Sequence, residues 1–99
     1  MKEGQYQQEL KKKIKEKLPE AVVLKNDPNW LQGFPDLTIL YKDRYAILEV
    51  KRCAAAEVQP NQEYYVNKAK DWAVFSSFIF PENEEEVLDG LQRSLATGR

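Results

Sequence analysis

Three charged residues in the segment GFPDLTILYKDRYAILEVKR, residues 33–52, have types and spacing that could hold a hard metal ion. Asp36 precedes the apolar run LTILY, and Glu49 and Lys51 stand near the end of a second run, YAILEV. Side chains alternate along a strand, so Glu49 and Lys51 share one face. Two carboxylates brought together repel each other unless a proton or a cation lies between them. A divalent cation is therefore a chemical reason for this cluster.

The register of the expected hairpin decides how closely these residues meet. A two-residue loop that closes Tyr41 against Arg44 puts Asp36 directly opposite Glu49, with Cβ atoms roughly 4.5–5.5 Å apart. A two-residue loop one place later pairs Asp36 with Lys51 and still leaves all three on one face. A three-residue loop would separate them.

A plainer interpretation of Glu49 and Lys51 is a solvated ion pair at a sheet edge, a common arrangement. Against it, LTILY and AILEV are apolar on both faces. Such strands suit the centre of a sheet that is covered on both sides, where charged side chains need a specific role. We therefore favour the metal site.

The composition limits the chemistry further. The 99 residues predict one domain, 1–99, with a net charge of −1, 42% hydrophobic residues and no apolar run of membrane-spanning length. We expect a cytoplasmic protein with no membrane partner. With one cysteine and no histidine, an internal disulfide, a Cys/His zinc site and histidine-based catalysis are excluded. Oxygen ligands favour Mg²⁺ or Mn²⁺.

Charge is unevenly distributed along the chain. Residues 1–26 contain seven Lys and four Glu, whereas residues 81–99 contain five acidic residues and two Arg. A local basic face could still contact phosphates despite the near-neutral total.

Hydrophobic periodicity predicts an α/β chain with the order α-β-β-β-α-β-α. Tyr6, Leu10 and Ile14 give the first helix an apolar stripe that ends before Pro19, Pro60 suits the first turn of a later helix, and Asn83 can cap the last one. The tail ATGR is expected to fray. The expected elements are a helix over 4–18, strands over 21–24, 37–41 and 45–51, a helix from 60 to about 70, a strand over 73–80 and a final helix from 84.

Pro35-Asp36, twelve further residues and then Glu49-Val50-Lys51 together resemble the signature of the PD-(D/E)XK nuclease superfamily. GFPDL, with the later QPNQ of residues 59–62, is similar to the VRR-Nuc group, which phages often encode and which is related to Holliday-junction resolvases. The resemblance covers roughly residues 5–80. It implies a restriction-endonuclease-like α-β-β-β-α-β core, a mixed central sheet flanked by helices, plus a C-terminal helix.

The resemblance also implies roles for the residues of the motif. Asp36, Glu49 and the Val50 carbonyl would be metal ligands, and Lys51 would position or deprotonate the attacking water. Glu9 would be the acidic ligand that this superfamily often carries on its first helix.

Several of these assignments have alternatives. Glu3 or Glu16 could replace Glu9 as the ligand, and Glu9 could be merely solvated. Gln62 shares a helical face with Val66, which would turn it inward as a catalytic residue, but it could be an ordinary first-turn glutamine.

Four residues are candidates for DNA contacts: Lys13, Trp30, Arg52 and Lys68. Lys13 belongs to a lysine-rich helix that could equally be a solvated face, and Trp30 could stack on a base or close over the core. The segment CAAAEV that follows Arg52 departs from the basic segment expected in this family.

The sequence thus predicts a metal-dependent DNA endonuclease, a homodimer that prefers branched or junction DNA, in a bacterial host cell if a phage encodes it. One alternative is a nucleic-acid-binding or assembly module that keeps the nuclease fold without turnover. Another is a small regulatory protein whose acidic C-terminal helix docks a partner.

Overall fold

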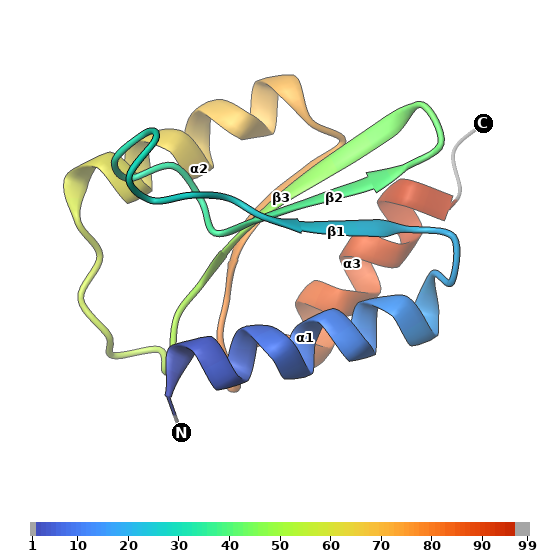
Figure 1. Cartoon of the computed structure of the whole chain (residues 1–99), viewed down its shortest axis with the longest axis horizontal. Helices are drawn as coiled ribbons and strands as arrows, with labels where there is room; N and C mark the ends of the chain where they lie inside the picture. Colours follow the sequence, from blue (N-terminus) through green and yellow to red (C-terminus); the bar gives the residue numbers. More distant parts are fainter. Residues whose placement is uncertain (1, 97–99) are drawn as a thin grey trace.

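The fold is a mixed four-stranded sheet flanked by three helices (Figure 1). The computed structural model describes residues 2–96. In the sheet order β1-β2-β3-β4, β1 and β3 run antiparallel to β2, while β4 is parallel to β3. The elements are α1 (Glu3–Lys17), β1 (Val22–Lys25), β2 (Leu37–Tyr41), β3 (Arg44–Val50), α2 (Pro60–Trp72), β4 (Phe75–Ile79) and α3 (Glu84–Ala96).

The predicted α/β class and element order are confirmed, and each predicted boundary lies within two residues of the observed one. Asn83 precedes α3 as expected, but its side chain accepts a hydrogen bond from the Phe80 amide at 2.8 Å and donates to the Phe78 carbonyl at 3.2 Å. It therefore fixes the start of α3 to the end of β4. The predicted fraying of the tail ATGR concerns mainly residues beyond Ala96, which lie outside the described residues. No helix within residues 2–96 is long and apolar enough to cross a membrane.

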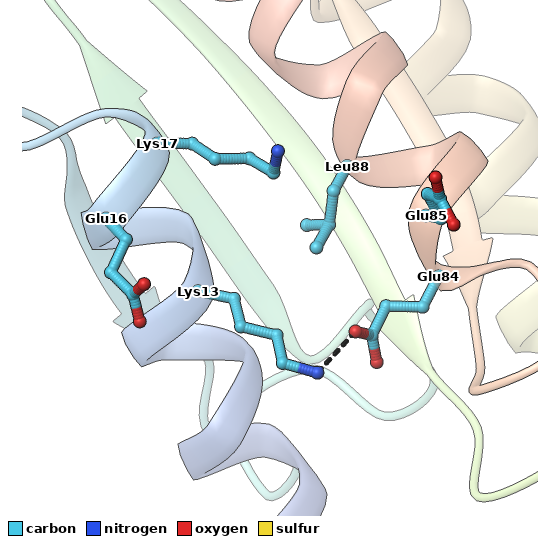
Figure 2. Close-up of a pocket in the computed structure, with 6 residues that line it drawn as sticks. All are labelled: Lys13, Glu16, Lys17, Glu84, Glu85 and Leu88. Carbon is cyan, nitrogen blue, oxygen red and sulfur yellow. Dashed lines mark hydrogen bonds and ion pairs between the residues drawn. The ribbon is translucent and has the colours of Figure 1, made fainter.

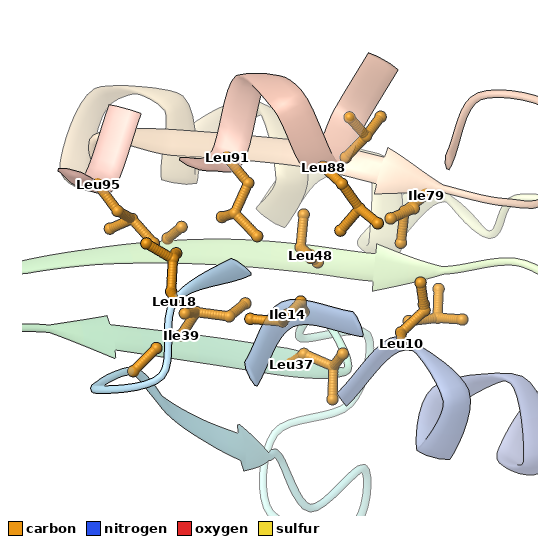
Figure 3. Packing of buried hydrophobic residues seen from close by; sticks show 14 of the residues in the cluster. Leu10, Ile14, Leu18, Leu37, Ile39, Leu48, Ile79, Leu88, Leu91 and Leu95 are labelled. Atoms are coloured by element: carbon orange, nitrogen blue, oxygen red, sulfur yellow. The ribbon is translucent and has the colours of Figure 1, made fainter. Parts of the chain in front are cut away.

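The helices form one layer on each side of the sheet. α1 and α3 lie on one face and α2 on the other, against β3 and β4 (Figure 1). The main core fills the α1/α3 side, where the predicted stripe of α1 meets leucines of α3 and strand residues such as Leu48 (Figure 3). Burial of these apolar side chains supplies the main driving force for the fold.

The β2–β3 hairpin adopts the first of the two registers considered. Tyr41 pairs with Arg44 across a two-residue loop, and the ladder continues to Leu37 opposite Leu48. Lys42 enters the left-handed region with φ 57° to make this tight turn. One further step places Asp36 opposite Glu49.

Alternation then decides which face these charged residues occupy. Leu37 and Leu48 belong to the core on the α1/α3 side. Their neighbours Asp36 and Glu49 therefore lie on the α2 side of the sheet, with Lys51.

The loop over residues 26–36 is held against α2 and delivers Asp36 to the sheet. Gly33 has φ +85°, and a Cβ added there would lie 2.3 Å from Asn61 Cβ, so only glycine allows this approach. The Asn26 side chain donates to the Pro35 carbonyl at 2.8 Å, and the Asn26 amide donates to the Asp36 carbonyl at 2.7 Å. These contacts fix the backbone on which the Asp36 carboxylate stands.

Candidate functional site

Asp36 and Glu49 form a crossed pair at the end of the β2–β3 ladder. The Asp36 amide donates to Glu49 Oε1 at 3.0 Å, and the Val50 amide donates to Asp36 Oδ2 at 2.9 Å. Each carboxylate is thus oriented by a backbone amide of the opposite strand segment. The two side chains need no further ordering to present oxygens together.

The electrostatics of this pair are unfavourable without a cation or a proton. Glu49 is only 3% exposed. Burial, the Asp36 charge and side-chain hydrogen bonding with Asp36 together raise the pKa of Glu49 to about 8, although the hydrogen bond from the Asp36 backbone amide acts in the opposite direction. At neutral pH, Glu49 in the metal-free protein therefore retains a proton that an ordinary surface glutamate would have lost.

The donor set fits a hard divalent cation. Two adjacent carboxylates supply oxygen ligands, and Mg²⁺ commonly binds to one or two carboxylates while keeping waters and substrate phosphate as its other ligands. Within residues 2–96, no three Cys, Asp or Glu side chains gather closely enough to hold a metal ion. The protein's share of the site is therefore the Asp36–Glu49 pair, and a ligand role for the Val50 carbonyl stays a prediction.

Lys51 follows this pair but is turned toward the next loop. Its Nζ donates to the Ala54 carbonyl at 3.2 Å and lies 5.7 Å and 5.5 Å from the ring centroids of Phe78 and Phe80. Its backbone amide donates to the Ile79 carbonyl at 2.8 Å, which extends the β3–β4 pairing. The ammonium group is held by a carbonyl and two rings instead of by a carboxylate, unlike the solvated ion pair considered above.

The first helix brings Glu3 to this end of the sheet. Burial raises the pKa of Glu3 and the Asp36 charge raises it further, whereas Arg52 and Lys25 act in the opposite direction. Glu3 also contributes to the raised pKa of Glu49. The candidate site thus has Glu3 as a third acid at its margin, and the cations Arg52 and Lys25 lie within electrostatic range of Glu3.

Glu9, the residue favoured from the sequence, helps to raise the pKa of Tyr6 and of Lys13 through its charge, and its role as a metal ligand stays a prediction. Helical spacing could have identified Glu3, because it lies three residues before Tyr6 and seven before Leu10 on the inward face. Gln7, one turn after Glu3, was not considered from the sequence; within the described residues its Oε1 is buried without a hydrogen-bond partner. Glu16 lines a hollow between α1 and α3.

Gln62 adopts the first-turn role that was its alternative interpretation. Its Oε1 accepts a hydrogen bond from the Gln59 amide at 2.9 Å, which caps the start of α2. Gln62 and Gly33 line a hollow of about 370 Å³ between α2 and the loop over residues 26–36. Gln62 therefore borders the segment that carries Asp36. A catalytic role for Gln62 stays a prediction.

Lys13 is engaged with α3 (Figure 2). Its Nζ forms an ion pair with Glu84 Oε2, and the Tyr6 hydroxyl donates to Glu84 Oε1 at 2.8 Å. Burial raises the pKa of Glu84, but the hydrogen bonds from Lys13 and Tyr6 outweigh it and lower the pKa overall. A phosphate contact by Lys13 stays a prediction that would compete with this pair.

The other three DNA-contact candidates are exposed. Trp30 is 90% exposed, so it does not close over the core. The charge of Arg52 acts on Glu3, which places Arg52 near the candidate site. Lys68 is exposed on the solvent side of α2.

No family model, curated protein or solved structure matches the chain. A functional assignment therefore depends on the geometry of its own residues.

Proposed function

We propose that the chain is a Mg²⁺- or Mn²⁺-dependent DNA endonuclease of the PD-(D/E)XK superfamily, VRR-Nuc group, with a restriction-endonuclease-like core. The observation that carries the proposal is the crossed pair of half-buried Asp36 and buried Glu49 at a strand end, with Lys51 just beyond the end of β3. The mixed sheet with helices on both faces agrees with that core.

Each residue of the site has a defined task in this proposal. A bound divalent ion would polarise the scissile phosphate and acidify the attacking water. Asp36 and Glu49 hold it with carboxylates that backbone amides have already oriented, so little reorganisation is needed. Lys51 leaves the Ala54 carbonyl to orient the water or the phosphate.

The positive charges near the pair suit a phosphate backbone. Arg52 and Lys25 both act on Glu3 and so lie within electrostatic range of the site. Because such contacts displace counterions, DNA binding should weaken steeply as salt is raised.

A homodimer that cuts branched DNA is part of the proposal. Val22, Leu24 and Leu40 are 48%, 44% and 39% exposed, and the pairing of Val22 with Leu40 puts them on one face at the β1 edge. This apolar face lies beside the part of the sheet that α2 covers and would suit a second copy. A two-fold dimer would supply two sites for two strands.

Sedimentation at micromolar concentration tests the dimer, and we expect Leu24→Lys to give monomers.

The function itself is tested with a cleavage panel. Linear duplex, flapped and four-way DNA are incubated with Mg²⁺, Mn²⁺ or EDTA, using wild type, Lys51→Ala and the matched surface variant Lys70→Ala. We expect metal-dependent cleavage that is lost in Lys51→Ala and kept in Lys70→Ala. Failure to cut any substrate with either metal, or wild-type rates from Lys51→Ala, would refute the mechanism.

A second candidate function is a DNA-binding module without turnover. The hydrogen bond from Lys51 to the Ala54 carbonyl favours it, because the ammonium is engaged by that carbonyl and not by the carboxylate pair. The same panel separates the two functions, since a binding module would shift DNA in a gel without cutting it.

A further inference from the structure

Trp30 is the most exposed of the large apolar side chains in the described chain, at 90%. It lines a hollow of about 270 Å³ together with Asn26, Asp27, Leu31 and Phe34. An exposed tryptophan beside a mostly apolar hollow indicates a surface for a ligand.

The loop that presents Trp30 is well ordered by hydrogen bonds. The Trp30 amide donates to the Asp27 carbonyl at 3.1 Å, and the Asn29 amide donates to Asp27 Oδ1 at 2.8 Å. Phe34 packs edge-on against Tyr65 of α2, with ring centroids 5.4 Å apart. The backbone that carries the indole is therefore ordered by a folded turn, which limits the backbone entropy lost when a ligand stacks on Trp30.

The chemistry of the hollow favours a nucleobase over a phosphate. Its apolar wall offers stacking area, while the Asp27 carboxylate at its rim repels anions and can accept hydrogen bonds from base N–H groups. A planar ring with polar edges satisfies both features. In a duplex both faces of a base are stacked, so the base would have to be unpaired.

The hollow also lies close to the candidate site along the chain. Trp30 is six residues before Asp36, a span of at most about 20 Å even for extended chain. We propose that this hollow stacks an unpaired nucleobase of the DNA substrate on Trp30, a few nucleotides from the bond to be cleaved. The proposal rests on the proposed function and narrows its substrate to DNA with single-stranded nucleotides beside the cut.

Binding without cleavage tests the stacking site. The full chain with Trp72→Phe retains Trp30 as its only tryptophan, and its fluorescence is followed in EDTA at low salt. The probes are dT15, an abasic oligomer of equal length and a blunt duplex. We expect dT15 to quench Trp30 strongly, and the other two to quench it weakly.

The affinity for fluorescein-labelled dT15 is then compared between variants by fluorescence anisotropy, because Trp30→Ala removes the tryptophan that reports quenching. Trp30→Ala should weaken it about tenfold, a typical loss for one base–aromatic stack, whereas Trp30→Phe should keep most of it. Trp72→Ala removes a half-exposed aromatic from the far end of α2 and serves as the matched control.

Several outcomes would overturn the stacking site. Equal quenching by the abasic oligomer, or unchanged affinity in Trp30→Ala, would do so. A blue shift of Trp30 emission with protein concentration in the absence of DNA would show that a second copy covers the hollow instead. Quenching by dT15 with an inactive cleavage panel would refute the nuclease and keep the stacking site, and cleavage without quenching would do the reverse.

Discussion

Two glutamates of this protein, one buried and one partly buried, stand in opposite electrostatic settings. Glu84, where α1 meets α3, receives hydrogen bonds from Lys13 and Tyr6, and its pKa is lowered. Glu49, on the other side of the sheet, faces Asp36, and its pKa is raised to about 8.

The difference separates a carboxylate whose charge is compensated within the fold from one whose charge is not. Glu84 has its counter-cation within the fold, so its charge is already compensated. Glu49 is buried next to a second acid, while Lys51 is directed to Ala54. A fold that retains such a pair has an incomplete charge balance, which a divalent cation would complete.

The largest expected effect concerns activity. Glu49→Gln should lower the cleavage rate by about a thousandfold or more, because it removes a charged ligand from the proposed metal site. Glu84→Gln should keep the rate within about twofold of wild type, since Glu84 lies outside the proposed site, the amide oxygen can still accept from Lys13 and the amide NH2 can donate to the Tyr6 hydroxyl. Single-turnover rates at saturating Mg²⁺ measure both.

Equal losses in the two variants would contradict this contrast between the glutamates. Circular dichroism of both variants serves as the control, because a lost fold would also abolish cleavage.

The positions of Asp36 and Glu49 at the end of the β2–β3 ladder could be predicted because strand alternation and hairpin register follow local rules. A two-residue loop between Tyr41 and Arg44 was enough to bring Asp36 opposite Glu49. The same rules fixed their shared face. The sequence therefore predicted that Asp36 and Glu49 share a face, and left open the register that pairs them directly.

The helix contributions were less predictable because they depend on how α1 lies on the sheet. Glu9 was favoured over Glu3, although it is Glu3 whose pKa the Asp36 charge raises. The pairing of Lys13 with Glu84 depends on a helix 71 residues away in the chain. No local pattern specifies such a contact.

The second prediction concerns the pH dependence of stability in EDTA. Because the pKa of Glu49 is raised in the folded state, its stabilising proton is fully present below its ordinary pKa of 4.5 and is lost as pH rises through about 8. Between pH 5 and 9, wild type should therefore lose about 2–4 kcal/mol more of its free energy of unfolding than Glu49→Gln. Urea unfolding at each pH measures this.

Glu84 should make stability depend on pH in the opposite direction, within the same set of unfolding measurements. Its lowered pKa contributes stability above its ordinary pKa of 4.5, and this is lost as pH falls through the lower folded value. Glu84→Gln should thus flatten only the acid side of the curve. A wild-type profile that is level from pH 5 to 9 would show that Glu49 is not held beside a second charge.

The third prediction uses Asp36→Asn, which removes one charge but keeps an oxygen for the Val50 amide. In EDTA at pH 8 this variant should be more stable than wild type by about 1–2 kcal/mol, because repulsion of Glu49 is relieved. In 10 mM Mg²⁺ the order should reverse, since metal stabilises only the folded wild type. Thermal melting in both buffers decides whether the two carboxylates form one site.

The smallest expected effect concerns Lys13, the cation that pairs with Glu84 where α1 meets α3. Lys13→Met should cost about 1 kcal/mol, because Glu84 is partly buried and loses a charged donor. Lys17→Met is the matched control on the same helix: its Nζ lies 3.9 Å from Asp89, both side chains are well exposed, and the loss should be under about 0.5 kcal/mol. Denaturant unfolding at low and high salt compares them. If the two losses are equal, or if salt abolishes both, Glu84 is an ordinary surface acid and its contrast with Glu49 reduces to a difference in burial.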